Sequence, residues 1–181
     1  KRQVRTTCDA AGLMTRFIAE RYQRGVLALD IGATSTSAHL CSQQRYSPIV
    51  LGGIGGGYGI GNILARCGVE AIRRWLPFPI SERNLVHWLL NKMLRPHIAP
   101  ANREEVLIEH AVAREALMEA MEAVRDERPR AEYDLVIIGG GILTHTPHPG
   151  LAMLTALDAL QPTAAESVLA LELHLDSLGL L

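Results

Sequence analysis

The chain of 181 residues has few aromatic residues and almost no net charge. Phe, Trp and Tyr make up 4% of the residues and hydrophobic residues 48%, so the core must be built mainly from aliphatic side chains. The formal net charge is −1, and no long block carries charge of one sign. Nucleic-acid and membrane-surface binding would need a cationic stripe, so we expect neither partner.

Cysteines and long apolar runs are also scarce. Cys8, Cys41 and Cys67 are far apart, odd in number and without a CxxC or Cys/His spacing, which favours reduced thiols. No apolar run reaches the roughly 18 residues of a membrane span, and no secretory signal is visible. We therefore expect a cytoplasmic location. Because the chain starts with Lys1 rather than Met, we also expect it to be part of a longer protein.

Hydrophobic periodicity predicts three strands in succession, then a helix and two inserted helices, and then alternating strands and helices. Strands are expected at 26–29, 36–41, 47–51, 133–141 and 168–173; helices are expected at 12–23, 62–75, 81–94, 102–125 and 150–160, with a last one from 176. On the helix at 102–125, the helical period places four acids on one side, which predicts a solvated face: Glu104, Glu115, Glu119 and Glu122. The order predicts an α/β fold with a mixed sheet and helices on both faces.

The stretch "GVLALDIGATSTSAHL", residues 25–40, ends a buried strand in an acid, a glycine and hydroxyl residues. Gly32 lets the backbone bend tightly, and the hydroxyls and backbone N–H groups of the turn suit phosphate oxygens. Asp30 would not contact the phosphate directly. It would hold a hydrated Mg²⁺ ion or orient a water molecule. The alternative is an ordinary hairpin rich in Thr and Ser, in which Asp30 caps a turn. The hydroxyl residues are Thr34, Ser35, Thr36 and Ser37.

A second buried strand also runs into glycines, at Gly139, Gly140 and Gly141. Three residues without Cβ atoms allow a purine or ribose to lie on the backbone. The alternative is a tight turn from strand to helix. If the two strands are parallel, both turns open on the same edge of the sheet, and a joint ligand site becomes the stronger interpretation.

Two further motifs are weaker. The run "LGGIGGGYGIGN" lacks the Lys-Ser or Lys-Thr of a phosphate loop, so we interpret it as a flexible joint or close-packing turn, with a ligand contact as the alternative. His145 and His148 are the only closely spaced histidine pair, but two ligands without a nearby Cys or acid do not make a metal site.

The motifs resemble those of a known family. "LDIGATSTS" resembles the second phosphate motif of the superfamily of actin, sugar kinases and heat-shock ATPases, and "VIIGGGILTHTPHPG" resembles its adenosine motif. Together with "LTALDALQP", they resemble the MutL-type accessory proteins of cobalamin-dependent glutamate (methylaspartate) mutase. These are unrelated to the mismatch-repair protein of the same name. The likeness spans roughly residues 10–181.

The resemblance implies a ribonuclease-H-like lobe at 25–181, with a helical insertion at about 76–128. Residues 1–24 would join it to a first lobe that is missing from this chain. It also implies ATP and Mg²⁺ as cofactors and a cobalamin-dependent mutase subunit as the partner that the protein reactivates or protects. Asp30 would be the catalytic residue and would hold Mg²⁺ through water. The implied nucleotide-binding residues are Gly32, Ala33, Thr34, Ser35, Thr36, Gly139, Gly140 and Gly141.

Two departures from the family pattern keep other functions open. Ala33 stands where the family has a second glycine, and Ser37 stands where it has an acid. We therefore expect at most weak ATP hydrolysis in the full-length protein and an inactive isolated chain. The alternatives are a non-catalytic interaction module with a degenerate nucleotide site and, less favoured, a carbohydrate kinase lobe.

Overall fold

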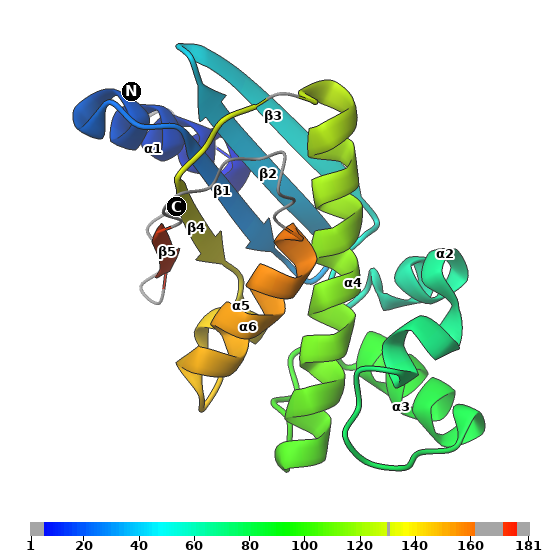
Figure 1. Ribbon diagram of the computed structural model, residues 1–181. Coiled ribbons are helices and arrows are strands. Elements are labelled where there is room, and N and C mark those ends of the chain that lie inside the picture. The colour runs from blue at the N-terminus through cyan, green and yellow to red at the C-terminus, as the bar shows by residue number, and fades with distance from the viewer. Residues whose placement is uncertain (1–5, 130, 162–171, 177–181) are drawn as a thin grey trace, which may run out of the picture.

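The protein is described by a computed structural model over residues 6–129, 131–161 and 172–176. These residues form a five-stranded mixed sheet with helices on both faces (Figure 1). The spatial order is β3-β2-β1-β4-β5, in which β1, β2 and β3 are antiparallel neighbours and β4 and β5 run parallel to β1. The strands are β1 (Val26–Ile31), β2 (Ser35–Ser42), β3 (Arg45–Gly52), β4 (Leu135–Gly139) and β5 (Glu172–Leu175).

Alternate residues of β1 serve the two faces of the sheet, as the pleat requires. Leu27, Leu29 and Ile31 belong to the large core beneath α4 (Arg103–Glu127) and α6 (Pro149–Leu160). Val26 and Ala28 belong to the smaller core beneath α1 (Thr7–Tyr22). The central strand is therefore buried on both sides, which explains its continuous apolar run.

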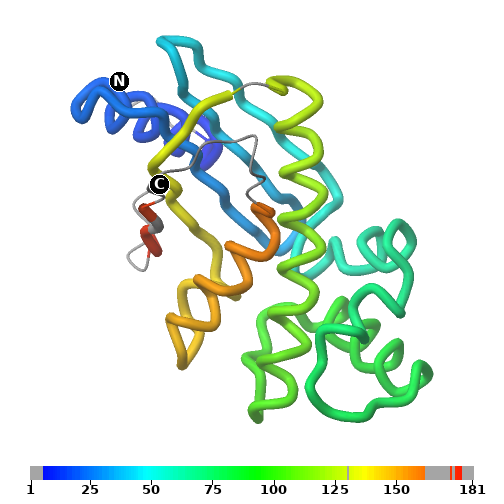
Figure 2. Tube along the Cα trace, viewed as in Figure 1, coloured from blue at the N-terminus to red at the C-terminus, as the bar shows by residue number. Residues whose placement is uncertain are grey.

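Two helices extend away from the sheet, as Figure 2 shows: α2 (Ile60–Arg73), in turquoise, and α3 (Glu82–Leu94), in green. α2 is kinked at Gly68, whose φ of 76° is outside the helical range. α4 packs both against α2 and across β1, β2 and β3. Within the predicted insertion at 76–128, α4 therefore covers the sheet of the lobe. The boundary between lobe and insertion stays a prediction.

Helix starts follow local capping chemistry. Asn102 Oδ1 accepts from Glu105 N at 2.9 Å, and Ser81 Oγ accepts from Asn84 N at 3.2 Å, at two of the positions where the sequence predicts helix starts. α1 begins earlier than predicted, because Thr6 and Asp9 form a capping box. A short helix α5 (Gly141–Thr144) was not predicted.

The last predicted elements lie partly outside the described residues. β5 (Glu172–Leu175) overlaps the strand expected at 168–173, but residues 168–171 are not described. The helix expected from 176 also falls outside the described residues.

The prediction of a solvated acidic face on α4 is wrong for Glu115. That residue is buried, and its Oε1 accepts from Nη1 of the equally buried Arg114 at 2.6 Å. The Arg114 guanidinium also pairs with Asp158 of α6 and lies 3.8 Å from the ring centroid of Trp75. Glu115 is thus buried beside Arg114, which a second helix and an aromatic ring hold in place, at a position that helical spacing alone assigns to solvent.

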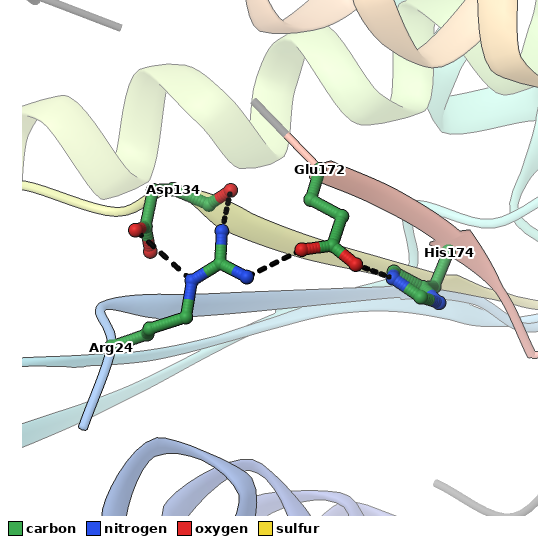
Figure 3. Close-up of polar contacts among 4 residues, drawn as sticks. All are labelled: Arg24, Asp134, Glu172 and His174. Carbon is green, nitrogen blue, oxygen red and sulfur yellow. Dashed lines mark hydrogen bonds and ion pairs between the residues drawn. The ribbon is translucent and has the colours of Figure 1, made fainter. Parts of the chain in front are cut away.

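A polar network joins the amino ends of the three parallel strands (Figure 3). Arg24 donates from Nε to Asp134 Oδ2 at 3.0 Å and also pairs with Glu172, which in turn contacts His174 Nε2 at 2.8 Å. Asp134 directly precedes β4, and Glu172 is the first residue of β5. This network lies at the end of the sheet opposite the carboxyl ends of β1 and β4.

Candidate functional site

A cleft of about 480 Å³ opens beyond the carboxyl ends of β1 and β4. In an open α/β sheet this edge is the usual place for ligands. The parallel register pairs Asp30 of β1 with Gly139 of β4. The two predicted turns therefore lie side by side: the first bend, around Gly32 after β1, and the second bend, around Gly140 after β4. The cleft is lined by residues from both bends, from the glycine run and from the helical segment, including Asp30, Gly32, Ala33, Gly57, Lys92, Glu109, Gly140, Gly141 and Thr146.

The first bend is hydrogen-bonded to the glycine run at residues 51–62. The carbonyl of Gly32 accepts from Gly56 N at 3.0 Å, and the carbonyl of Ala33 accepts from Gly57 N at 3.0 Å. A Cβ on Gly55 would lie 2.7 Å from the Gly32 oxygen. The run is therefore a close-packing turn, one of the two structural interpretations of the sequence, and Gly56 and Gly57 also line the cleft.

The second bend touches the first directly. Gly140 has a φ of 101°, and a Cβ there would lie 2.3 Å from the Ile31 carbonyl oxygen. A Cβ on Gly139 would lie 2.8 Å from Asp30 Oδ1. The glycines thus allow two strand ends to meet without a side chain between them.

Asp30 is a half-buried acid at this junction. Burial raises the pKa of its carboxyl group, and the nearby charge of Asp176 raises it further. No group of three or more His, Cys, Asp or Glu side chains close enough to share a metal ion exists within the described residues. A Mg²⁺ ion would fit here only if water and phosphate oxygens supplied most of its ligands, which is the coordination Mg²⁺ prefers beside phosphates.

The hydroxyl residues after Gly32 do not all face the cleft. Thr34 is exposed and Ser35 is half-buried. Thr36 is fully buried and donates to the Ile54 carbonyl at 2.9 Å, so its proton is already engaged. Ser37 is buried in β2, opposite Asp30 in the register. The cleft lining includes Gly32 and Ala33 but none of the four hydroxyl residues, so the predicted hydroxyl contacts with a ligand stay a prediction.

The opposite wall of the cleft contains an ion pair that sequence reasoning missed. Lys92 of α3 pairs with Glu109 of α4, and its Nζ also donates to the Ile98 carbonyl at 2.5 Å. Burial raises the pKa of Glu109, and Lys92 partly opposes that rise. The available signal was the polar pair Glu109-His110 inside the apolar run "VLIEHAVA" at 106–113.

The two histidines of the "THTPHPG" segment separate in the structure. His145 lines the cleft, and its Nδ1 lies 3.3 Å from the Gly141 carbonyl oxygen. His148 is exposed and precedes α6 as its N-cap. Thr146, between them, also lines the cleft and contacts His110 of α4.

The sheet order β3-β2-β1-β4-β5, with β2 antiparallel to β1 and β4 parallel to it, is that of a ribonuclease-H-like lobe. The fold class predicted from the sequence is confirmed. The chain belongs to the MutL protein family, whose model matches residues 1–181. None of the helices within the described residues is long and apolar enough to cross a membrane.

Solved structures with a similar fold include the PilM–PilN type IV pilus biogenesis complex, at 24% identity and a TM-score of 0.48 over 92% of this chain and 40% of that one. A ROK hexokinase from Thermus thermophilus has 16% identity and a TM-score of 0.45 over 96% of this chain and 61% of its own. Component A of (R)-2-hydroxyglutaryl-CoA dehydratase from Acidaminococcus fermentans has 12% identity and a TM-score of 0.39 over 96% of this chain and 62% of its own. The chain thus spans 40–62% of these three proteins. A search of curated proteins found no match.

Proposed function

We propose that the cleft is one half of an ATP–Mg²⁺ site, which a second lobe outside this chain completes. The observation that carries the proposal is the direct contact of the two glycine bends beside the Asp30 carboxylate. Backbone groups around Gly32, Ala33, Thr34 and Ser35 would meet the phosphates, and residues 139–141 would meet the adenosine. Gly32 and Ala33 already line the cleft, as do Gly140 and Gly141.

Asp30 would organise the metal's water shell. Burial and the charge of Asp176 raise the pKa of its carboxyl group, so the protein surroundings disfavour the charged carboxylate. A divalent cation would reverse that preference and draw the ionised form. Bound Mg²⁺ would neutralise phosphate charge, while Asp30 would hold or orient the water beside it.

The partner in this proposal is a subunit of a cobalamin-dependent mutase, which the whole protein would reactivate or protect by closing two lobes around ATP. Membership of the MutL protein family and the resemblance of the glycine motifs support it. Since function depends on sites rather than folds, this part needs its own test. The expected result is ATP-dependent recovery of mutase activity after inactivation.

A second candidate is an interaction module that has lost nucleotide chemistry. Ser37 supplies no acid beside Asp30, and the Thr36 hydroxyl is bound to a backbone carbonyl. This candidate predicts partner binding that does not depend on ATP. A carbohydrate kinase lobe would instead show turnover that depends on a sugar.

The decisive experiment is a titration of the full-length protein with ATP and Mg²⁺, followed by turnover measurements. We expect Asp30→Asn to abolish turnover while the melting temperature stays within a few degrees, because a neutral amide avoids the cost of a buried charge. The matched control is Asp126→Asn, at an exposed position near the end of α4. Absence of ATP binding in the unaltered protein would leave the interaction module, and unfolding of Asp30→Asn would make Asp30 a structural residue.

A further inference from the structure

His110 is a buried histidine with a partner at each ring nitrogen. It lies on α4, is 4% exposed and is outside the cleft itself. Its Nδ1 lies 3.0 Å from Thr155 Oγ1, and its Nε2 lies 3.1 Å from Thr146 Oγ1. The ring therefore connects α6 to the loop that forms one wall of the cleft.

Thr155 Oγ1 has two acceptors within reach, the Leu151 carbonyl at 2.8 Å and His110 Nδ1 at 3.0 Å, and its single proton serves one of them. With the proton on the closer acceptor, the backbone carbonyl, Thr155 accepts from His110, and Nδ1 then carries the ring proton. Burial lowers the pKa of His110 to about 4, so the ring is neutral at physiological pH and its Nε2 is an acceptor.

The orientation of the Thr146 hydroxyl follows from this tautomer. An unprotonated Nε2 can bind Thr146 Oγ1 only by accepting its proton. The Thr146 oxygen then has lone pairs but no proton to offer to the cleft that it lines. Ile142 and Pro147 line the same wall, so Thr146 and the neighbouring His145 are the polar side chains that this segment presents to the cleft.

We propose that Thr146, positioned by His110, is a specificity-determining hydrogen-bond acceptor for an N–H group of the ligand. Within the proposed function, on which this inference rests, that group is the 6-amino group of adenine. An acceptor with its own proton engaged accepts from an amine and cannot donate to the carbonyl of a 6-oxo purine. His110 is a positioning residue, because it acts through Thr146.

The test compares ATP with purine riboside 5′-triphosphate, which has hydrogen in place of the 6-amino group. We expect the unaltered full-length protein to bind ATP about threefold to tenfold more tightly, the ratio that one neutral hydrogen bond supplies. Thr146→Val, which keeps the shape of the side chain and removes the acceptor, should bring the ratio close to one. Thr146→Ser keeps the hydroxyl and should retain the preference.

The outcomes separate this inference from the proposed function. ATP binding with a ratio that Thr146→Val leaves unchanged would overturn the role of Thr146 and leave the nucleotide site in place. Absence of binding for both nucleotides would refute the proposed function, and with it the ligand assigned to Thr146. The hydrogen-bond pattern has an independent readout in the ¹⁵N NMR shifts of His110 without ligand. We expect a neutral ring protonated at Nδ1, and protonation at Nε2 would overturn the inference.

Discussion

The contact between the two bends makes a strong prediction for Gly140→Ala. A Cβ at this position would lie 2.3 Å from the Ile31 carbonyl oxygen and 2.7 Å from its nitrogen, both backbone atoms that cannot rotate away. The φ of 101° adds strain for any residue with a side chain. Strain of about 1–3 kcal/mol and overpacking of about 1–3 kcal/mol together predict a loss of about 2–6 kcal/mol in the free energy of unfolding.

Urea unfolding followed by circular dichroism measures this loss. With an m-value of about 2 kcal/mol per molar urea, the midpoint should fall by about 1–3 M. The matched control is Gly150→Ala, in the first turn of α6, where an added Cβ meets nothing within 4 Å. The control should be unchanged or stabilised by up to about 1 kcal/mol. If Gly140→Ala unfolded at the same urea concentration as this control, the two strand ends would not meet as described.

Two further predictions concern buried charges. Lys92→Met leaves the Glu109 carboxylate without its partner and should lower the free energy of unfolding by about 3 kcal/mol. The loss should be smaller at pH 5 than at pH 8, because protonated Glu109 tolerates burial. Adding Glu109→Met to Lys92→Met should restore most of the lost stability. Equal losses at both pH values would contradict this account. For His110, the unfolded chain binds a proton near pH 6.5 and the folded chain only near pH 4, so stability should fall by about 3 kcal/mol as the pH drops through that window. His110→Gln should flatten this part of the urea-midpoint profile relative to the exposed control His87→Gln, and parallel profiles would show that His110 is not neutral in the folded state.

The sequence was informative about the sheet because the relevant signals are local. Continuous apolar runs that end in glycines predicted two central strands, and the structure places them parallel and adjacent, with Asp30 opposite Gly139. Asn102 and Ser81 predicted helix starts by their capping chemistry, which also acts within three residues. The edge at which both bends lie followed from topology alone.

The second wall of the cleft could not be predicted in the same way, since its contacts join distant segments. Lys92 and Glu109 are 17 positions apart on different helices, and His110 reaches Thr146 across 36 positions. The prediction of a solvated acidic face on α4 was wrong at Glu115 for a related reason. Helical spacing places Glu115 with exposed acids, but Arg114 and the neighbouring helices bury it. A single sequence does not specify which helix covers which face.

The departures at Ala33 and Ser37 weigh differently once the geometry is known. Ala33 is exposed on the first bend and lines the cleft beside Asp30, so its methyl group does not fill the junction between the bends. Ser37 is buried opposite Asp30, where a second carboxylate would raise the pKa of Asp30 further. Serine at this position therefore adds no charge beside Asp30, whose carboxyl pKa is already raised by burial and by the charge of Asp176.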